Sequence, residues 1–156
     1  MSSSAPPLDT RFSAALAADD PQAEAAACRT LESLPALVNA DPWLVHRARF
    51  LTAGCLIQVG RVPYHLTIAA GRIAALERGA RPLTAWSFAI RATARGWTEF
   101  WQPVPEPKWH DLFALTRYGE AVVEGNLLPL LQNLQAVKDM LAAPRRAAPH
   151  PHAGKP

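Results

Sequence analysis

The stretch of sequence that decides the fold runs from Gly119 to Ala142 and reads GEAVVEGNLLPLLQNLQAVKDMLA. It begins with a short apolar run, residues 121–124, which ends in Gly125 and Asn126. This pattern predicts a strand followed by a turn, because glycine and asparagine interrupt strands and favour turns. A helix is expected after the turn, since apolar residues then recur three or four positions apart. The apolar positions of this helix are Leu127, Leu130, Leu131, Leu134, Val137 and Leu141.

The predicted C-terminal helix has one apolar stripe and carries no charged residue from position 126 to position 137. A helix of this kind must lie against apolar material. That material is either the packed core of the domain or an apolar ligand held in a cavity. The stripe alone leaves both interpretations open, and the choice between them is the question of function.

The formal net charge of +3 does not indicate a basic binding face. Residues 144–156 contain Arg145, Arg146 and Lys155 and no acidic residue, so the rest of the chain has thirteen basic and thirteen acidic residues. A near-neutral domain argues against nucleic acid as a partner. The 144–156 tail is rich in proline, alanine and histidine, which predicts disorder. A weak contact of this basic tail with an anionic membrane surface stays open.

The two cysteines do not form a metal or disulfide pattern. Cys28 and Cys55 lie among small or apolar residues and lack metal-site spacing, so we expect buried thiols and no bound metal or cofactor. No signal-peptide pattern is visible, and no apolar run approaches the roughly 20 residues that a membrane-spanning helix needs. We therefore expect a soluble, cytoplasmic protein.

The remaining sequence predicts an α+β domain over residues 21–143. Residues 1–20 are expected to be disordered or weakly helical, and Asp20-Pro21 is a typical helix start. A helix over 22–39 should divide near Pro35. Alternation with a period of two then predicts strands at 43–51, 55–59, 64–68, 72–77 and 85–93. Short helices are expected at 93–101 and 108–118, so that one mostly antiparallel sheet is covered on one face by helices.

Three features in this order resemble the sterol carrier protein family, also called non-specific lipid-transfer domains. They are the hairpin at 64–73, the aromatic strand at 86–91, and the segment from Gly119 through the Gly125-Asn126 junction into the apolar helix. The family commonly has aspartate where this chain has Asn126, and asparagine caps a helix equally well. The resemblance implies a five-stranded sheet that encloses an apolar tunnel for sterols, fatty acids or their acyl thioesters.

The resemblance places a ligand site between the aromatic strand and the C-terminal helix. The candidate ligand-binding residues are Trp86, Phe88, Ile90, Trp97, Phe100, Trp101, Phe113, Leu127, Leu130, Leu131, Leu134 and Lys138. All the apolar ones are equally compatible with an ordinary core. Lys138 lies near the edge of the stripe, where its amine either extends to solvent or pairs with a carboxylate or phosphate headgroup.

The function predicted from these features is binding of an apolar ligand, as a carrier or presenting protein without catalytic activity. Two alternatives stay open. One is a small isomerase or dehydratase acting on an apolar substrate, for which the acid or base candidates are His46, His65, His110 and Asp111. The other is a ligand-free accessory subunit that binds a partner enzyme. A homodimer also stays open.

Overall fold

The computed structural model describes residues 8–79 and 85–147, and one five-stranded sheet organises them. The strands are β1 (Ala53–Val59), β2 (Val62–Ala69), β3 (Arg72–Arg78), β4 (Phe88–Ala92) and β5 (Ala121–Gly125). Their order is β3-β2-β1-β4-β5; β1 and β4 are parallel and the other neighbours are antiparallel. The predicted α+β fold with a mostly antiparallel five-stranded sheet is confirmed.

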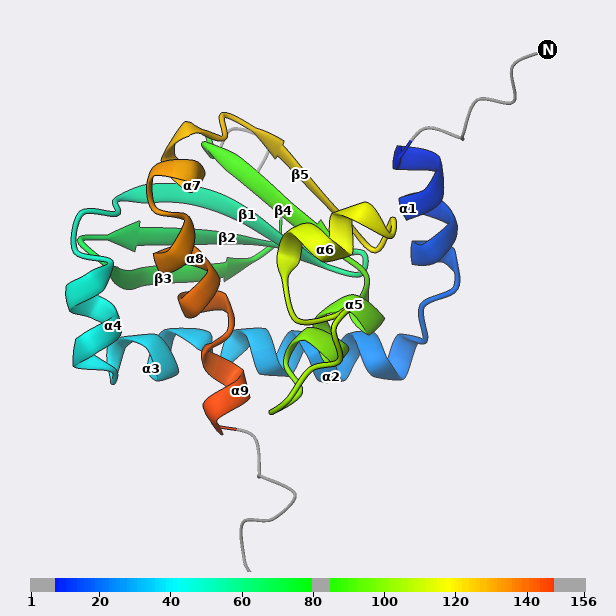
Figure 1. Cartoon of the computed structure of the whole chain (residues 1–156), viewed down its shortest axis with the longest axis horizontal. Helices are drawn as coiled ribbons and strands as arrows, with labels where there is room; N and C mark the ends of the chain where they lie inside the picture. The colour runs from blue at the N-terminus through cyan, green and yellow to red at the C-terminus, as the bar shows by residue number, and fades with distance from the viewer. Residues whose placement is uncertain (1–7, 80–84, 148–156) are drawn as a thin grey trace, which may run out of the picture.

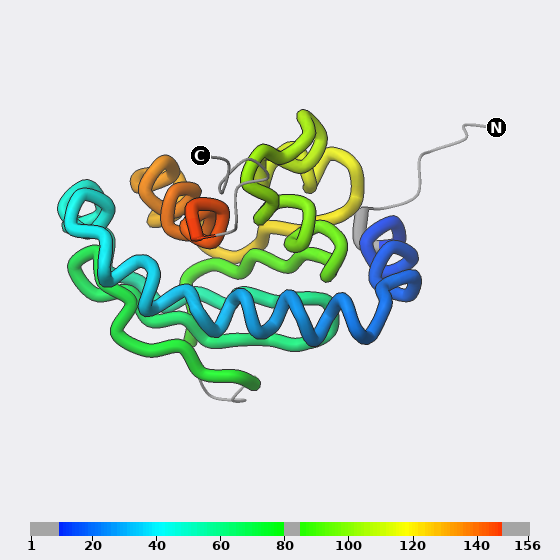
Figure 2. Tube along the Cα trace, turned by 90° about the horizontal axis from the view of Figure 1, so that it is seen from below, coloured from blue at the N-terminus to red at the C-terminus, as the bar shows by residue number. Residues whose placement is uncertain are grey.

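The helices gather on one side of this sheet (Figures 1 and 2). They are α1 (Leu8–Ala17), α2 (Pro21–Glu32), α3 (Leu34–Asn39), α4 (Pro42–Arg47), α5 (Ala94–Phe100), α6 (Leu112–Arg117), α7 (Leu128–Gln132), α8 (Leu134–Leu141) and α9 (Ala143–Ala147). In the described part of the chain, no helix is long and apolar enough to cross a membrane.

The two faces of the sheet differ in polarity because side chains alternate along each strand. Ile57 pairs in register with Ile90, and both are buried in the core beneath the helices. On the opposite face Leu56 and Ala89 are also apolar and buried, whereas Gln58 and Arg91 are polar. There Arg91 donates hydrogen bonds to Glu124, at 2.7 Å, and to Gln58. The sheet therefore presents its more apolar face to the helices.

Helices α2 and α3 follow the predicted pattern. Asp20 caps α2 by accepting a hydrogen bond from the backbone N–H of Gln22 at 3.3 Å, and Pro21 occupies the first turn. Proline is tolerated there because the first N–H groups of a helix have no partner within the helix. The helix ends at Ser33 and α3 begins just before Pro35, as predicted.

The prediction of a strand over residues 43–51 was wrong, since α4 occupies this segment. Asp41 caps α4 by accepting a hydrogen bond from Leu44 N–H at 3.1 Å. Leu44, Ala48 and Leu51 are buried, and their spacing of four and three residues follows a helical turn rather than a strand. The cap and this spacing outweigh the local alternation of polar and apolar residues.

The predicted continuous C-terminal helix is also corrected, because it divides into α7 and α8 at Asn133. Asn133 has a non-helical backbone (φ −125°, ψ 29°), and its side-chain amide donates a hydrogen bond to Pro129 O at 3.1 Å. Side chains of this type compete with helical hydrogen bonds. Within α7, before this break, Leu130 is buried while Leu131 is 56% exposed, so the predicted apolar residues do not form one buried stripe.

The described parts of both chain ends are helical, and a weak helix is one of the two expectations for residues 1–20. Helix α1 lies within residues 1–20 and packs beside β5, where it buries Phe12. Helix α9 takes up the first residues of the 144–156 tail, with Pro144 buried. Residues 1–7, 80–84 and 148–156 lie outside the described residues.

A substitution at Gly125 tests the junction between β5 and α7. Gly125 has φ +96°, and a Cβ there would lie 2.7 Å from Ser87 O and 2.8 Å from the Trp86 ring. We expect Gly125→Ala to lower the free energy of unfolding by about 2–4 kcal/mol, from left-handed strain plus overpacking. The matched control is Gly79→Ala, with φ +104° and no atom of the described residues within 4 Å of the added Cβ. Urea denaturation should show the smaller loss for the control; equal losses would contradict the close packing at the junction.

The cysteines give a second test. Both thiols are buried, and burial raises the pKa of Cys55 to about 12. Because the thiolate is the reactive form, we expect Cys55 not to react with a disulfide reagent in the folded protein at pH 8. Both cysteines should react within minutes in guanidinium chloride. Mass spectrometry of modified peptides measures this, and rapid labelling of Cys55 under native conditions would contradict the buried site.

Candidate functional site

Half of the sequence-predicted ligand residues lie together in the closed core. They come from β4, from α5 with its C-terminal residue, and from α7, and each is at most 6% exposed. These residues are Phe88, Ile90, Trp97, Phe100, Trp101 and Leu130. These six side chains are thus part of the buried core between the sheet and the helices.

The other apolar candidates surround this core or lie outside it. Leu127 and Leu134 are partly buried against the core, whereas Leu131 is exposed. Trp86 precedes β4 and lies over Gly125 instead of joining Phe88 inside.

The last two candidates, Lys138 and Phe113, lie at the surface between α6 and α8. The Lys138 amine forms a 2.9 Å ion pair with Asp111 and lies 5.3 Å from the centre of the Phe113 ring. Both ion-pair side chains are 27% exposed, which places the pair near the solvent boundary. Lys138 thus already has an anionic partner within the protein.

Helix α5 fixes the two tryptophans through its own local geometry. Thr93 caps the helix by accepting a hydrogen bond from Gly96 N–H at 2.9 Å. Residues three and four apart share a helix face, so Trp97 meets Phe100 edge to face at 5.7 Å and stacks on Trp101 at 5.1 Å. Trp101 donates its indole N–H to Leu141 O at 2.8 Å, which orients the ring.

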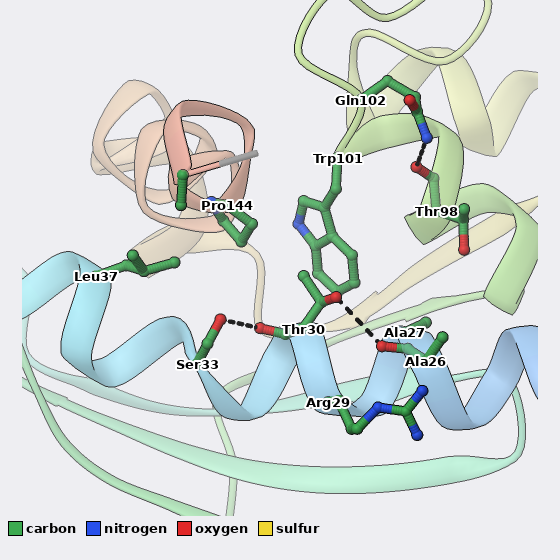
Figure 3. Close-up of a pocket in the computed structure, with 11 residues that line it drawn as sticks. Ala26, Ala27, Arg29, Thr30, Ser33, Leu37, Thr98, Trp101, Gln102 and Pro144 are labelled. Atoms are coloured by element: carbon green, nitrogen blue, oxygen red, sulfur yellow. Dashed lines mark hydrogen bonds between the residues drawn. The ribbon is translucent and has the colours of Figure 1, made fainter. Parts of the chain in front are cut away.

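The Trp101 ring forms part of an open groove of about 490 Å³ between α2, α5 and α9 (Figure 3). Figure 3 shows the Trp101 ring above Thr30 of α2 and beside Pro144 of α9. The lining residues are Ala26, Ala27, Arg29, Thr30, Ser33, Leu37, Thr98, Trp101, Gln102, Pro144 and Ala147. Arg29 supplies the one charged side chain among these described lining residues, and most of the wall is apolar.

Two of the three hydroxyl groups among the described lining residues, those of Thr30 and Ser33, are already used in hydrogen bonds at the end of α2. Thr30 donates to Ala26 O at 3.2 Å, and Ser33 donates to Thr30 O at 2.6 Å. Hydroxyls that bond the preceding turn of their own helix leave mainly their carbon atoms toward a ligand. The groove is therefore suited to an alkyl or alicyclic group more than to a polar one.

Sequence reasoning identified Trp101 but missed the rest of the groove. Its walls come from helices that are far apart in the sequence, and α2 contributes through alanines instead of large apolar residues. Ala26 and Ala27 make a low surface next to the tall Trp101 ring. The alanine-rich composition of α2 was the available signal, since small side chains on a helix leave space beside it.

A second, polar pocket of about 330 Å³ lies where α8 and α9 meet the loop before α6. Arg145 donates hydrogen bonds to Phe100 O at 2.6 Å and to His110 O at 2.8 Å. Burial lowers the pKa of Arg145, and the nearby Asp111 opposes this effect. The two cations of this pocket, Arg145 and Lys138, both bind protein groups. Neither therefore offers a free positive charge to a ligand.

The acid and base candidates do not come together in one site. His46 is on α4, His65 is on β2 beside Ala85 O, and His110 adjoins Asp111 before α6. Within residues 8–79 and 85–147, no three His, Cys, Asp or Glu side chains form a group that could hold a metal ion.

Comparison with known proteins gives matches in structure. No protein-family model and no curated protein sequence matches the chain. The crystal structure of sterol carrier protein 2 is 19% identical with a TM-score of 0.59, over 77% of this chain and 96% of that chain. A second match is the solution structure of a conserved hypothetical protein from Thermus thermophilus, described as possibly a sterol carrier protein. It is 16% identical with a TM-score of 0.54, over 81% of this chain and 91% of that chain.

A third structure, described as UbiJ-SCP2 ubiquinone synthesis protein, is 17% identical with a TM-score of 0.50, over 76% of this chain and 89% of that chain. At these identities the likeness concerns the fold. It extends over nearly the whole chain of sterol carrier protein 2. The resemblance predicted from the sequence is confirmed at this level, and the chain has the fold of sterol carrier protein 2.

Proposed function

We propose that this protein binds an apolar ligand carrying an alkyl or alicyclic group, in the groove between α2, α5 and α9. The observation that carries the proposal is the groove itself: about 490 Å³, mainly apolar walls and a fixed tryptophan. Ligand pockets in proteins commonly measure about 300–1,000 Å³ and combine apolar walls with a few polar groups. The likeness to sterol carrier protein 2 supports the same ligand class.

The expected driving force is burial of apolar ligand surface. A ligand that buries on the order of 200 Å² gains about 5 kcal/mol at about 25 cal/mol per Å², before the cost of ordering it. Arg29 is the charged residue among the described lining residues, and Figure 3 shows its side chain on the side of α2 away from the Trp101 ring, so the groove itself receives mainly the apolar part of a ligand. With so few polar contacts, selectivity among apolar ligands should be broad.

This proposal moves the ligand from the interior to the surface. The sequence placed it against Phe88, Ile90 and Leu130, which the structure buries in its core. Trp101 belongs both to the ligand-binding residues predicted from the sequence and to the groove, because one side of its ring stacks on Trp97 and its edge reaches the groove. A carrier or presenting role fits a groove that is open to solvent, since a ligand enters it without unfolding of the core.

Two tryptophan substitutions on α2 test the groove. Ala26 lines the groove and is exposed, so Ala26→Trp should fill the groove at a small cost in stability. The matched control is Ala25→Trp, at an exposed position of the same helix that is not among the lining residues. We expect the fluorescent fatty acid cis-parinarate to bind to wild type and to Ala25→Trp, and at least about tenfold more weakly to Ala26→Trp.

The measurement is energy transfer from tryptophan to cis-parinarate, with competition by oleate and cholesterol sulfate. Equal binding by both variants would refute the groove as the ligand site and would favour a site in the interior of the domain. A wild-type protein that binds none of these probes would refute the proposed function and favour an accessory subunit that binds a partner enzyme.

A further inference from the structure

Helix α4 and the turn after it carry a set of exposed aromatic and basic side chains at one end of the molecule. We propose that this surface, the α4 face, docks on an anionic phospholipid bilayer. The α4 face consists of Trp43, His46, Arg47, Arg49 and Phe50. The inference rests on exposure, rigidity and charge at this surface and is independent of the proposed ligand groove.

The two aromatic rings are far more exposed than is usual for their type. Trp43 is 78% exposed and Phe50 is 80% exposed. Single exposed apolar residues are common on protein surfaces, but two large aromatic rings on one short segment form a patch. Trp43, His46 and Phe50 recur at a spacing of three and four residues, which places them on the solvent side of the same turns.

The opposite side of this segment is anchored firmly in the core. Leu44, Ala48 and Leu51 are each at most 1% exposed. The backbone N–H of Gly71, in the turn between β2 and β3, donates a hydrogen bond to Leu51 O at 3.1 Å. The exposed rings are therefore held outward by a fixed scaffold, so that binding through them costs little ordering of the backbone.

The basic residues of the α4 face surround the rings. The Arg49 guanidinium lies 4.4 Å from the centre of the Phe50 ring and donates a hydrogen bond to His46 O at 2.7 Å. Arg47 forms a 2.9 Å ion pair with Asp139, and its side chain is still 52% exposed. The Arg49 cation therefore lies beside the apolar Phe50 ring, and its bonds to the described residues include no carboxylate.

The carboxylate that caps α4 is also engaged. Asp41, which caps α4, forms a 3.2 Å ion pair with Arg146 of α9. Asp41 and Asp139 are thus both paired with arginines, and Arg49 adds a positive charge to the α4 face. Positive side chains near a membrane are attracted to anionic headgroups, and aromatic rings prefer the boundary between headgroups and acyl chains.

The shape of this end of the molecule favours a flat partner. Figures 1 and 2 both show α4 projecting at one end of the molecule. A projecting element with apolar tips and basic flanks can insert into the surface of a bilayer, as interfacial helices do. A pocket for a small molecule would need a concave surface instead.

Vesicle flotation tests the proposal with the full chain. We expect wild type to float with phosphatidylcholine vesicles containing about 30% phosphatidylglycerol in low salt, and to be released by about 0.5 M salt. The double variant Trp43→Ala/Phe50→Ala should bind at least about tenfold more weakly, and so should Arg49→Glu. The matched controls are Val104→Ala, a 75% exposed apolar residue elsewhere, and Arg61→Glu, in the exposed turn between β1 and β2. Both controls should bind within about twofold of wild type.

A second measurement reports insertion directly. Trp43→Phe keeps an apolar ring, so it should float as wild type does, but it should lose the tryptophan emission that brominated phosphatidylcholine quenches. Far-UV circular dichroism confirms that each variant is folded. Failure of wild type to float, equal loss in the control variants, or quenching unchanged in Trp43→Phe would overturn the proposal. Binding of the α4 face to an acidic protein segment, without vesicle binding, would overturn it as well.

Discussion

The structure depends on the stacked pair of Trp97 and Trp101, which joins the sheet to the layer of C-terminal helices. Trp97 donates its indole N–H to Gln58 O of β1 at 2.9 Å, and Trp101 donates to Leu141 O at the end of α8 at 2.8 Å. The short helix α5 thus connects the sheet with the C-terminal helices through two fixed rings and two satisfied donors. Buried indole groups are stable only when the N–H has a partner, so each ring position is defined by its hydrogen bond.

This connection explains why the candidate binding surface lies outside the core. The rings, with Phe88 and Ile90 from the sheet, fill the space beneath the C-terminal helices. Close-packed interiors have little room for a guest. The edge of Trp101 remains at the boundary, where the alanines of α2 leave a groove. The same tryptophan therefore closes the core and forms the wall of the groove.

The groove and the α4 face use different physical properties. The groove is concave and mainly apolar, and it lies between α2, α5 and α9. The α4 face is projecting, with exposed Trp43 and Phe50 beside arginines. A protein that takes an apolar ligand from a bilayer would need both a place for the ligand and a means to approach the membrane. The two proposals are separately testable because no residue belongs to both surfaces.

The sequence by itself determined the sheet, the capped start of α2 and the resemblance to a known fold, because alternation, Asp20-Pro21 and Gly125-Asn126 act over a few neighbouring residues. It failed where local signals conflict: the Asp41 cap made a helix of residues 42–47, and Asn133 divided the C-terminal helix. Only the tertiary structure decided which apolar residues are core and which line a surface. Leu130 and Leu131 are neighbours in one apolar run, and their burial differs because packing against other elements, rather than hydrophobicity alone, fixes exposure.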